Sequence, residues 1–490
     1  MSFTRSSRKS LFSIHTYEKA MFCLCVLHIF LRLPLRTMIP FNDGNVYYAT
    51  VFNIIQNNLN PFIFTISYKP PVISELMAII FSVFHPSIVI GNIAMYIISS
   101  VTLWYIYLLG KRVFTPVVGF YAALLCSLFP LFTAQSVVFN DAVIVTTVVL
   151  ATVYYFFSSN WIGYGIACSL LVLTKEPLLA VPVLLYIYSV IYTFQKSHTS
   201  FLTILIKRIP LLFPLILFPI WMYINKQTLG IYLDPINQNK SYLHRFYGAP
   251  IQEILKYLFV KNGMWWIWLT FGVTLLKHSN RIKKQWIIIM WFITIFLFYG
   301  IFFSLSAFNP RYMLPYFPYV FISFCAVLFF AYSKKFFRLF ILLTVIMFLG
   351  IHINLFFFNV SDGWGEGDLR IIQTTSLYTK TFEYVYEHYQ HPLIVTYPEV
   401  YTWSDTAFGK TPGAYKYECY FFNQINDEKE EMQRMFTYAK EKNASPIIFI
   451  QPSYMGEVNE INAIRKLPIK RINNPWNKYN YHDLYEIAVQ

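Results

Sequence analysis

Long apolar runs follow one another through the first 358 residues, separated by short polar segments. Each run approaches the roughly 20 residues that an α-helix needs to cross a bilayer. The runs lie near residues 20–38, 87–109, 117–138, 142–157, 161–174, 177–194, 209–225, 263–276, 286–307, 312–331 and 339–358. The pattern predicts an α-helical polytopic membrane protein with about 11 transmembrane helices.

Basic residues gather on one side of these predicted spans, which we call the basic face. Alternate threading places five segments there, and they contain fifteen Lys and Arg residues but no Asp or Glu. The segments are residues 1–17, 110–116, 195–208, 277–285 and 332–338. Because basic loops are retained on the cytoplasmic side, we expect a cytoplasmic basic face and N-terminus. The extracytoplasmic side then receives Asp43, Lys69, Glu75, Asp141, Lys175, Glu176, Arg311 and the tail from residue 359 onward.

Composition agrees with a membrane protein. Of the 490 residues, 56% are hydrophobic and 20% aromatic, which is too apolar for a water-soluble chain of this length. The formal net charge is +15, and the basic face alone contains fifteen positive charges. Membrane anchoring therefore explains the excess charge better than nucleic-acid binding, and we expect no nucleic-acid partner.

Two segments depart from simple spanning. The stretch 39–86 is too long for a hairpin, and its apolar piece 72–84 is too short to cross, so we predict an external loop with an interfacial helix. After residue 358 the pattern becomes that of a soluble protein, with helices near 377–389 and 427–442 among short strands at 393–396, 446–450, 467–472 and 483–488. We therefore predict a transmembrane domain at 1–358 and a small extracytoplasmic α/β domain at 359–490.

Charged residues recur where the predicted spans meet the extracytoplasmic side. Asp43, Asp141, Lys175, Glu176 and Arg311 all lie at such junctions. A charge at membrane depth costs roughly 2.5 to 3.5 kcal/mol, so a set at one level favours a shared polar cavity. Cations suit a phosphate group, and a carboxylate beside them can take a proton from an attacking hydroxyl or amine. The combination indicates group transfer from a phosphate-linked donor.

Five short motifs carry a family resemblance. They are Asp-Gly-Asn-Val-Tyr-Tyr-Ala at 43–49, Lys-Pro-Pro-Val at 69–72, Phe-Asn-Asp at 139–141, Leu-Thr-Lys-Glu-Pro at 173–177 and Pro-Arg-Tyr-Met-Leu-Pro at 310–315. In this order the motifs resemble those of the GT-C membrane glycosyltransferases, in the branch of the protein O-mannosyltransferases and aminoarabinose transferases. The resemblance covers roughly residues 20–330 and implies transfer of a sugar from a polyprenyl-phosphate donor, with inversion, to a lipid, glycan or protein acceptor.

The resemblance also implies roles for individual residues. Asp43 corresponds to the catalytic base and Asp141 to a second catalytic acid that shapes the donor or acceptor site. Lys69, Lys175 and Arg311 correspond to the groups that contact the donor phosphate. Tyr47, Glu75, Glu176 and Tyr312 are expected to support them; from its position alone, Glu75 either lies on a solvated face or orients Lys69.

Two departures from the family pattern matter, namely Gly44 after Asp43 and Val72 in place of the usual leucine. Gly44 follows Asp43 where the family often has a second acid. The sequence therefore predicts no required cofactor and leaves open whether a divalent metal binds. The chain also has no insertion long enough for the β-trefoil of eukaryotic protein mannosyltransferases, which favours a bacterial or archaeal enzyme of the cell envelope.

Two other functions remain open from the sequence. A transporter or flippase for a polar lipid would also need charges around a cavity, although the chain shows neither inverted repeats nor charges at mid-membrane. A dolichyl-phosphate-mannose-dependent mannosyltransferase of the endoplasmic reticulum would have a similar architecture. Asn239, Asn359 and Asn443 start glycosylation triplets in external segments, and glycans there would favour this alternative.

Overall fold

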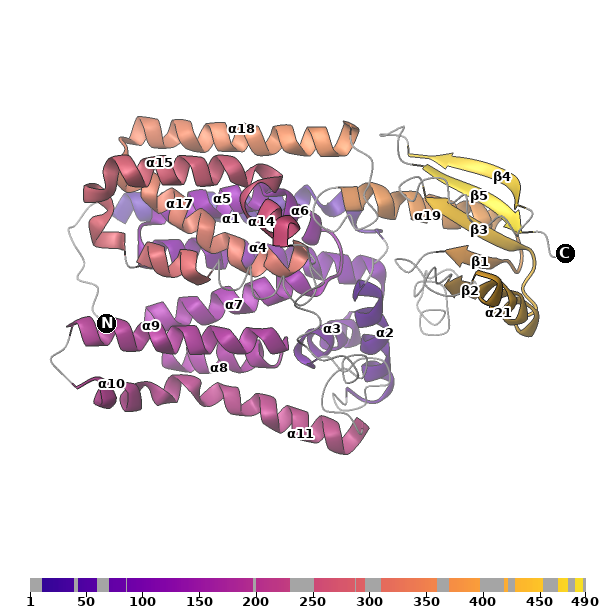
Figure 1. Cartoon of the computed structure of the whole chain (residues 1–490), viewed down its shortest axis with the longest axis horizontal. Helices are drawn as coiled ribbons and strands as arrows, with labels where there is room; N and C mark the ends of the chain where they lie inside the picture. The colour runs from indigo at the N-terminus through magenta and orange to yellow at the C-terminus, as the bar shows by residue number, and fades with distance from the viewer. Residues whose placement is uncertain are drawn as a thin grey trace.

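A computed structural model shows a long helical bundle followed by a small β-sheet (Figure 1). It describes residues 11–38, 43–59, 70–84, 86–196, 200–229, 251–286, 288–295, 310–358, 370–396, 418–421, 428–452, 466–474 and 481–487. Within these ranges, Asp43 and Glu176 are described by their backbones alone.

The bundle is built from α-helices joined by short 3-10 segments. The α-helices are α1 (Leu11–Phe30), α2 (Asp43–Gln56), α3 (Val72–Val83), α4 (Ile88–Val113), α5 (Pro116–Leu128), α6 (Pro130–Gln135), α7 (Asp141–Ser158), α8 (Trp161–Val172), α9 (Ala180–Lys196), α10 (Phe201–Arg208), α11 (Leu217–Leu229), α14 (Ile251–Phe259), α15 (Met264–Ile282), α17 (Phe317–Ala331) and α18 (Lys334–Phe358). The 3-10 segments are η1 (Leu33–Leu35), η2 (Glu176–Leu179), η3 (Ile209–Ile216), η4 (Lys261–Gly263), η5 (Lys283–Gln285) and η6 (Pro310–Tyr316).

The polytopic membrane class is confirmed. In the described part of the chain, six helices are long and apolar enough to cross a bilayer. They are Ile88–Val113, Asp141–Ser158, Pro177–Gln195, Phe201–Thr228, Arg311–Ala331 and Lys334–Phe357. The expected count of about 11 is not confirmed. One reason is that the apolar run 117–138 is two helices, α5 and α6, because Pro130 cannot continue the first helix.

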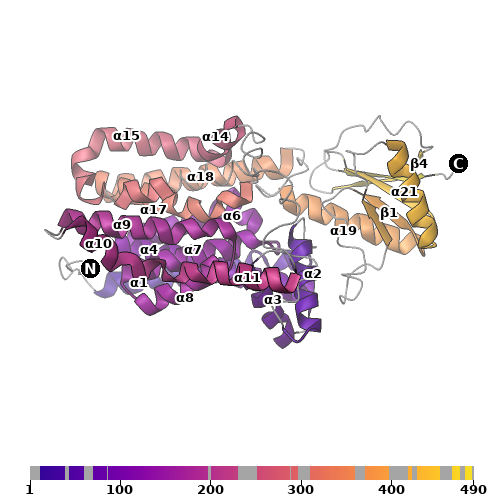
Figure 2. The ribbon, with the colours of Figure 1, turned by 60° about the horizontal axis from the view of Figure 1, so that its bottom comes forward.

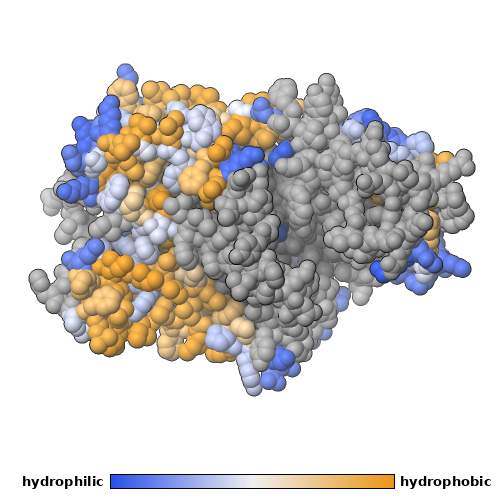
Figure 3. Space-filling model, in the orientation of Figure 1, coloured by the Kyte–Doolittle hydropathy of each residue, from blue (hydrophilic) through white to orange (hydrophobic). Residues whose placement is uncertain are grey.

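Burial separates the central helices from the peripheral ones. Of an 18-residue apolar window in Arg311–Ala331, 89% is buried inside the protein, whereas the share in Lys334–Phe357 is only 17% although that segment is more apolar. In water an exposed apolar helix would be unfavourable, but in a bilayer it faces lipid tails. On the face shown in Figure 3, the described surface of the bundle is mostly apolar, and polar surface lies at its end remote from the β-sheet and on the sheet itself.

Small residues allow the central helices to approach closely. A Cβ atom on Gly110 of α4 would lie 2.5 Å from Cα of Gly119 in α5. A Cβ atom on Gly119 would lie 2.4 Å from the carbonyl oxygen of Tyr107. The two helices therefore pack backbone to backbone, as small residues permit in membrane bundles.

The C-terminal part is a five-stranded sheet with order β2-β1-β3-β5-β4. Its elements are α19 (Arg370–His388), β1 (Leu393–Thr396), β2 (Glu418–Phe421), α21 (Glu428–Glu441), β3 (Ile447–Pro452), β4 (Lys466–Asn473) and β5 (Tyr481–Ile487). Strand β1 pairs in parallel with β2 and β3, and β5 pairs antiparallel with β3 and β4. The expected helices and the four expected strands are present; β2 was not predicted, because Glu-Cys-Tyr-Phe has none of the β-branched residues found in the other strands.

Helix α19 lies between the bundle and the sheet (Figures 1 and 2). Its first turn places Ile371 and Ile372 in an apolar cluster with Tyr96 of α4, and its later turns contact β4 and β5. The division of the chain at residue 358 stays a prediction, because residues 359–369 fall outside the described ranges.

Candidate functional site

Asp141 is a buried carboxylate at the start of α7. The side chain of Asn140, the N-cap residue, accepts a hydrogen bond from the Asp141 backbone N–H at 2.6 Å and so fixes the beginning of the helix. A negative charge in the first turn is stabilised by the partial positive charge of the helix N-terminus. Because the Asp141 side chain is only 1% exposed, it still needs a cation beside it.

Lys175 supplies that cation. It follows α8 in an extended conformation, and its Nζ atom lies 2.7 Å from Oδ2 of Asp141. The same Nζ atom lies 3.9 Å from the ring centroid of Tyr312. Burial is the largest influence on the pKa of Lys175 and lowers it, but the opposing effects of Asp141 and Tyr312 leave this pKa above its ordinary value. Lys175 therefore remains a cation within the site.

Arg311 approaches the same tyrosine from η6. Its side chain is 2% exposed, its guanidinium carbon lies 5.2 Å from the Tyr312 ring centroid, and Nη2 donates a hydrogen bond to the Tyr312 hydroxyl at 3.5 Å. Both cations thus contact one aromatic ring, with Asp141 beside Lys175. We call Asp141, Lys175, Arg311 and Tyr312 the junction cluster; together with Tyr316 and their apolar neighbours they line one small recess.

Tyr47 of helix α2 contacts the junction cluster. The buried Tyr47 hydroxyl donates a hydrogen bond to Oδ2 of Asp141 at 3.4 Å. Asp43 begins α2, one helical turn before Tyr47, and residues four apart share a helix face. The side chain of Asp43 lies outside the described part, so its place relative to the cluster stays a prediction.

The start of α3 is joined to the end of α8. The Val72 backbone N–H donates a hydrogen bond to the Leu173 carbonyl oxygen at 3.2 Å. The Lys-Pro-Pro-Val and Leu-Thr-Lys-Glu-Pro motifs are therefore neighbours in space, although about 100 residues separate them in the chain. Lys69 itself lies outside the described residues.

The two supporting glutamates remain predictions. Glu75 lies in the first turn of α3, and among the described residues its buried Oε1 atom has no hydrogen-bond partner. Burial raises the pKa of the Glu75 carboxyl group. Whether Glu75 orients Lys69 is untested, and the Glu176 side chain lies outside the described part.

Two aromatic residues around the site were given no role from the sequence, although Phe139 is part of the Phe-Asn-Asp motif. The Phe139 ring lies 4.8 Å from the Tyr48 ring and 6.2 Å from the Tyr47 ring, so it packs α2 against the start of α7. Tyr316 lines the recess from η6. In the sequence these aromatic residues resemble ordinary core residues, and only the tertiary contacts distinguish them.

A second buried polar cluster lies at the end of α1. Arg32 is 5% exposed, donates from Nε to the Ser136 hydroxyl at 2.7 Å and from Nη1 to the His28 carbonyl oxygen at 3.0 Å. His28 shares a hydrogen bond with the Ser99 hydroxyl at 2.8 Å. These contacts attach the end of α1 to α4 and to Ser136, the residue after α6. In the described ranges, no group of three or more His, Cys, Asp or Glu side chains is arranged to hold a metal ion.

Comparison with known proteins gives one family match. Residues 68–223 match the family described as dolichyl-phosphate-mannose-protein mannosyltransferase. This segment contains the Asp141 and Lys175 motifs and begins at the Lys-Pro-Pro motif. A search of curated protein sequences found no match.

Solved structures show the same fold. The chain is similar to ArnT from Cupriavidus metallidurans bound to undecaprenyl phosphate, with a TM-score of 0.56 and 11% identity over 96% of this chain and 98% of that one. It is also similar to the Archaeoglobus fulgidus oligosaccharyltransferase tethered with an acceptor peptide, with a TM-score of 0.50 and 12% identity over 89% of this chain and 69% of that one. The expected resemblance is confirmed: residues 68–223 match the mannosyltransferase family model, and nearly the whole chain has the fold of ArnT.

Proposed function

We propose that this chain is an integral membrane glycosyltransferase that transfers a sugar from a polyprenyl-phosphate donor to a lipid, glycan or protein acceptor. The observation that supports this proposal best is the junction cluster, which unites a carboxylate and two cations from three separate motifs. The ArnT structure bound to undecaprenyl phosphate is consistent with a lipid-phosphate ligand for this fold.

The cations are suited to the donor phosphate. Arg311 offers a planar fork of donors, and Lys175 offers a compact charge that Asp141 and Tyr312 hold in place. Lys69 would add a third cation, since its motif abuts the Lys175 motif. In this assignment Asp141 is a positioning residue, because it acts through Lys175.

Asp43 is proposed as the general base. An acceptor hydroxyl or amine attacks the anomeric carbon of the sugar while its proton passes to the Asp43 carboxylate. The bond between the anomeric carbon and the phosphate oxygen breaks, and polyprenyl phosphate leaves with the electron pair, stabilised by the cations. A single displacement inverts the anomeric configuration. Phosphate is a good leaving group, so the step needs no second carboxylic acid to protonate it.

The charge sorting supports an extracytoplasmic reaction. The described parts of the motifs meet at the end of the bundle opposite the described basic segments, and α19 and the sheet lie at that same end (Figure 1). We therefore propose a cytoplasmic N-terminus and an extracytoplasmic C-terminal domain, as the positive-inside rule requires. A divalent metal is left open, and no step here depends on it.

Replacing the proposed base tests the function. Mass spectrometry of surface lipids and glycoproteins should find one sugar missing in cells without the gene. Wild-type protein should restore that sugar, whereas Asp43→Asn should fold normally and lower transfer by about 100-fold to 10,000-fold. Asp483→Asn is the matched control, because Asp483 forms an exposed pair with Arg471 in the sheet. Full transfer by Asp43→Asn would overturn the assignment.

A further inference from the structure

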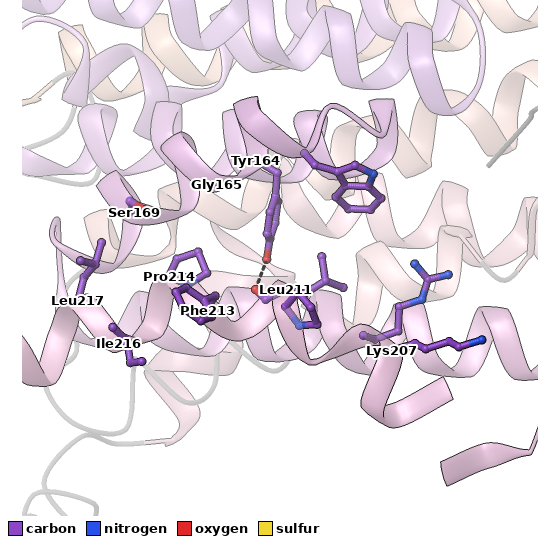
Figure 4. Close-up of a pocket in the computed structure, with 12 residues that line it drawn as sticks. Tyr164, Gly165, Ser169, Lys207, Leu211, Phe213, Pro214, Ile216 and Leu217 are labelled. Carbon is purple, nitrogen blue, oxygen red and sulfur yellow. Dashed lines mark hydrogen bonds between the residues drawn. The ribbon is translucent and has the colours of Figure 1, made fainter. Parts of the chain in front are cut away.

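A long groove lies on the side of the bundle between α8, α10, η3 and the start of α11 (Figure 4). Its volume is about 470 Å³, enough to hold part of a lipid chain. It lies apart from the junction cluster and shares none of its residues.

Local sequence explains why the groove is hollow. Gly165 lies in its α8 wall, and a Cβ atom there would have no neighbour within 4 Å. Pro210 and Pro214 in the opposite wall lack backbone donors, and η3 is a 3-10 rather than an α-helix. The buried Tyr164 hydroxyl donates a hydrogen bond to the Leu211 carbonyl oxygen at 2.9 Å, joining the two walls across the floor (Figure 4).

The groove opens toward the bilayer rather than toward water. Phe213 on its rim is 71% exposed, and Ile216 and Trp161 are each at least half exposed. The segment Phe201–Thr228, which forms one wall, is only 22% buried inside the protein although it is strongly apolar. Such a surface is stable only against lipid.

One end of the groove is cationic. Lys207 and Arg208 lie there, and Arg208 Nη2 is anchored by a hydrogen bond to the Thr193 hydroxyl at 3.1 Å. Ser169, Ile216 and Leu217 lie toward the other end (Figure 4). No acidic side chain is among the described residues that line the groove, and the only acidic residue between positions 160 and 229 is Glu176.

The cationic end lies far from the junction cluster. Trp161, the first residue of α8, also lines the groove, and 14 positions separate it from Lys175 beyond the other end of that helix. At 1.5 Å per residue this is roughly 20 Å, most of the thickness of the hydrocarbon core. A phosphate bound by Lys207 and Arg208 would therefore occupy the leaflet on the basic face, opposite the proposed donor site.

We propose that this groove is a binding site for an anionic phospholipid of the leaflet on the basic face. Lys207 and Arg208 bind the headgroup phosphate, one acyl chain runs along Gly165 and Pro214, and Trp161 lies at headgroup level. The charge at one end and the apolar wall beyond it match the two halves of such a lipid. A donor lipid is a poorer occupant, because its phosphate would lie in the wrong leaflet for the junction cluster.

Native mass spectrometry of the full chain, exchanged into micelles with equal phosphatidylglycerol and phosphatidylcholine, tests the proposal. Wild-type protein should retain phosphatidylglycerol preferentially. The double variant Lys207→Ala/Arg208→Ala should bind phosphatidylglycerol roughly 10-fold to 30-fold more weakly, since each basic residue near the membrane surface contributes about fivefold to the affinity. Lys334→Ala/Lys335→Ala, another exposed basic pair on the same face, is the matched control.

Filling the groove tests the acyl-chain half. Gly165→Trp should reduce retention of both lipids, and Gly165→Leu serves if the larger side chain prevents folding. Gly272→Trp in α15 is the control, because a Cβ there also meets no neighbour within 4 Å but lies outside the groove. Equal retention of the two lipids by wild-type protein would overturn the proposal. So would an unchanged preference in the Lys207/Arg208 variant, or displacement of phosphatidylglycerol by added polyprenyl phosphate.

Discussion

Lys175 Nζ lies 2.7 Å from Oδ2 of Asp141, although the two residues are 34 positions apart. Asp141 begins α7 and Lys175 follows α8, so the two residues meet at the open end of the α7–α8 hairpin. The pair closes the hairpin at its site end, and Tyr47 and Tyr312 contact it from α2 and η6. One ion pair thus links several of the family motifs, and its loss should affect stability as well as function.

Removing the cation should destabilise the bundle. Lys175→Met removes the cation that pairs with the buried Asp141 carboxylate, which we expect to cost about 3 to 5 kcal/mol. The double variant Asp141→Asn/Lys175→Met should recover most of the stability but not the activity. The measurement is the fraction of monodisperse protein in detergent after stepwise heating. Wild-type stability in Lys175→Met would show that the pair contributes little.

Arg311 should be sensitive even to replacement by another cation. Arg311→Lys keeps the charge but removes the planar fork, so the KM for the donor should rise about 10-fold with a smaller change in kcat. Arg281→Lys is the control, because Arg281 donates to the Ala331 carbonyl oxygen at the other end of α17. If both variants gave the wild-type KM, Arg311 would have no part in donor binding.

The close packing of α4 and α5 should tolerate no additional carbon. Gly119→Ala places a methyl group 2.4 Å from the Tyr107 carbonyl oxygen, and we expect destabilisation of about 1 to 3 kcal/mol. Gly350→Ala in α18 meets no atom within 4 Å and should be neutral or slightly stabilising. The measurement is the midpoint temperature of thermal aggregation of the two purified variants. Equal midpoints would contradict the prediction.

Acid should loosen the contact between α19 and the sheet. Burial lowers the pKa of His482 to about 3 from an ordinary 6.5, and its Nδ1 atom shares a hydrogen bond with the Thr381 hydroxyl at 2.8 Å. Between these pH values the unfolded state binds more protons than the folded state, so stability falls as pH is lowered through that window.

Hydrogen exchange of β5, corrected for the intrinsic exchange rate, can measure this effect. Protection should fall by up to about tenfold per pH unit below pH 6.5, the limit for one proton. His482→Gln should flatten this dependence, whereas His388→Gln at the exposed end of α19 should leave it unchanged. The same slope in all three proteins would exclude His482 as the cause.

Much of the fold was predictable because its physical causes are local. Apolar runs near the length of a bilayer span predicted the membrane class, and alternation of strands and helices predicted the tail. The division of 117–138 at Pro130 shows the limit of this reasoning. An apolar run reports the environment of a segment, whereas the break inside it is set by a single residue, Pro130, which the apolar pattern does not register.

The sequence by itself determined which residue types meet the membrane boundary, since the cost of burying charge confines ionised side chains to the span ends. Only the tertiary structure decided that Lys175 and Arg311 contact one aromatic ring, that Asp141 pairs with Lys175 and that Tyr47 joins them. It also decided that Gly165 opens onto a groove, whereas Gly119 lies against a neighbouring backbone. Composition and spacing are properties of the chain, but contact between distant segments depends on how whole helices pack, which local pattern does not specify.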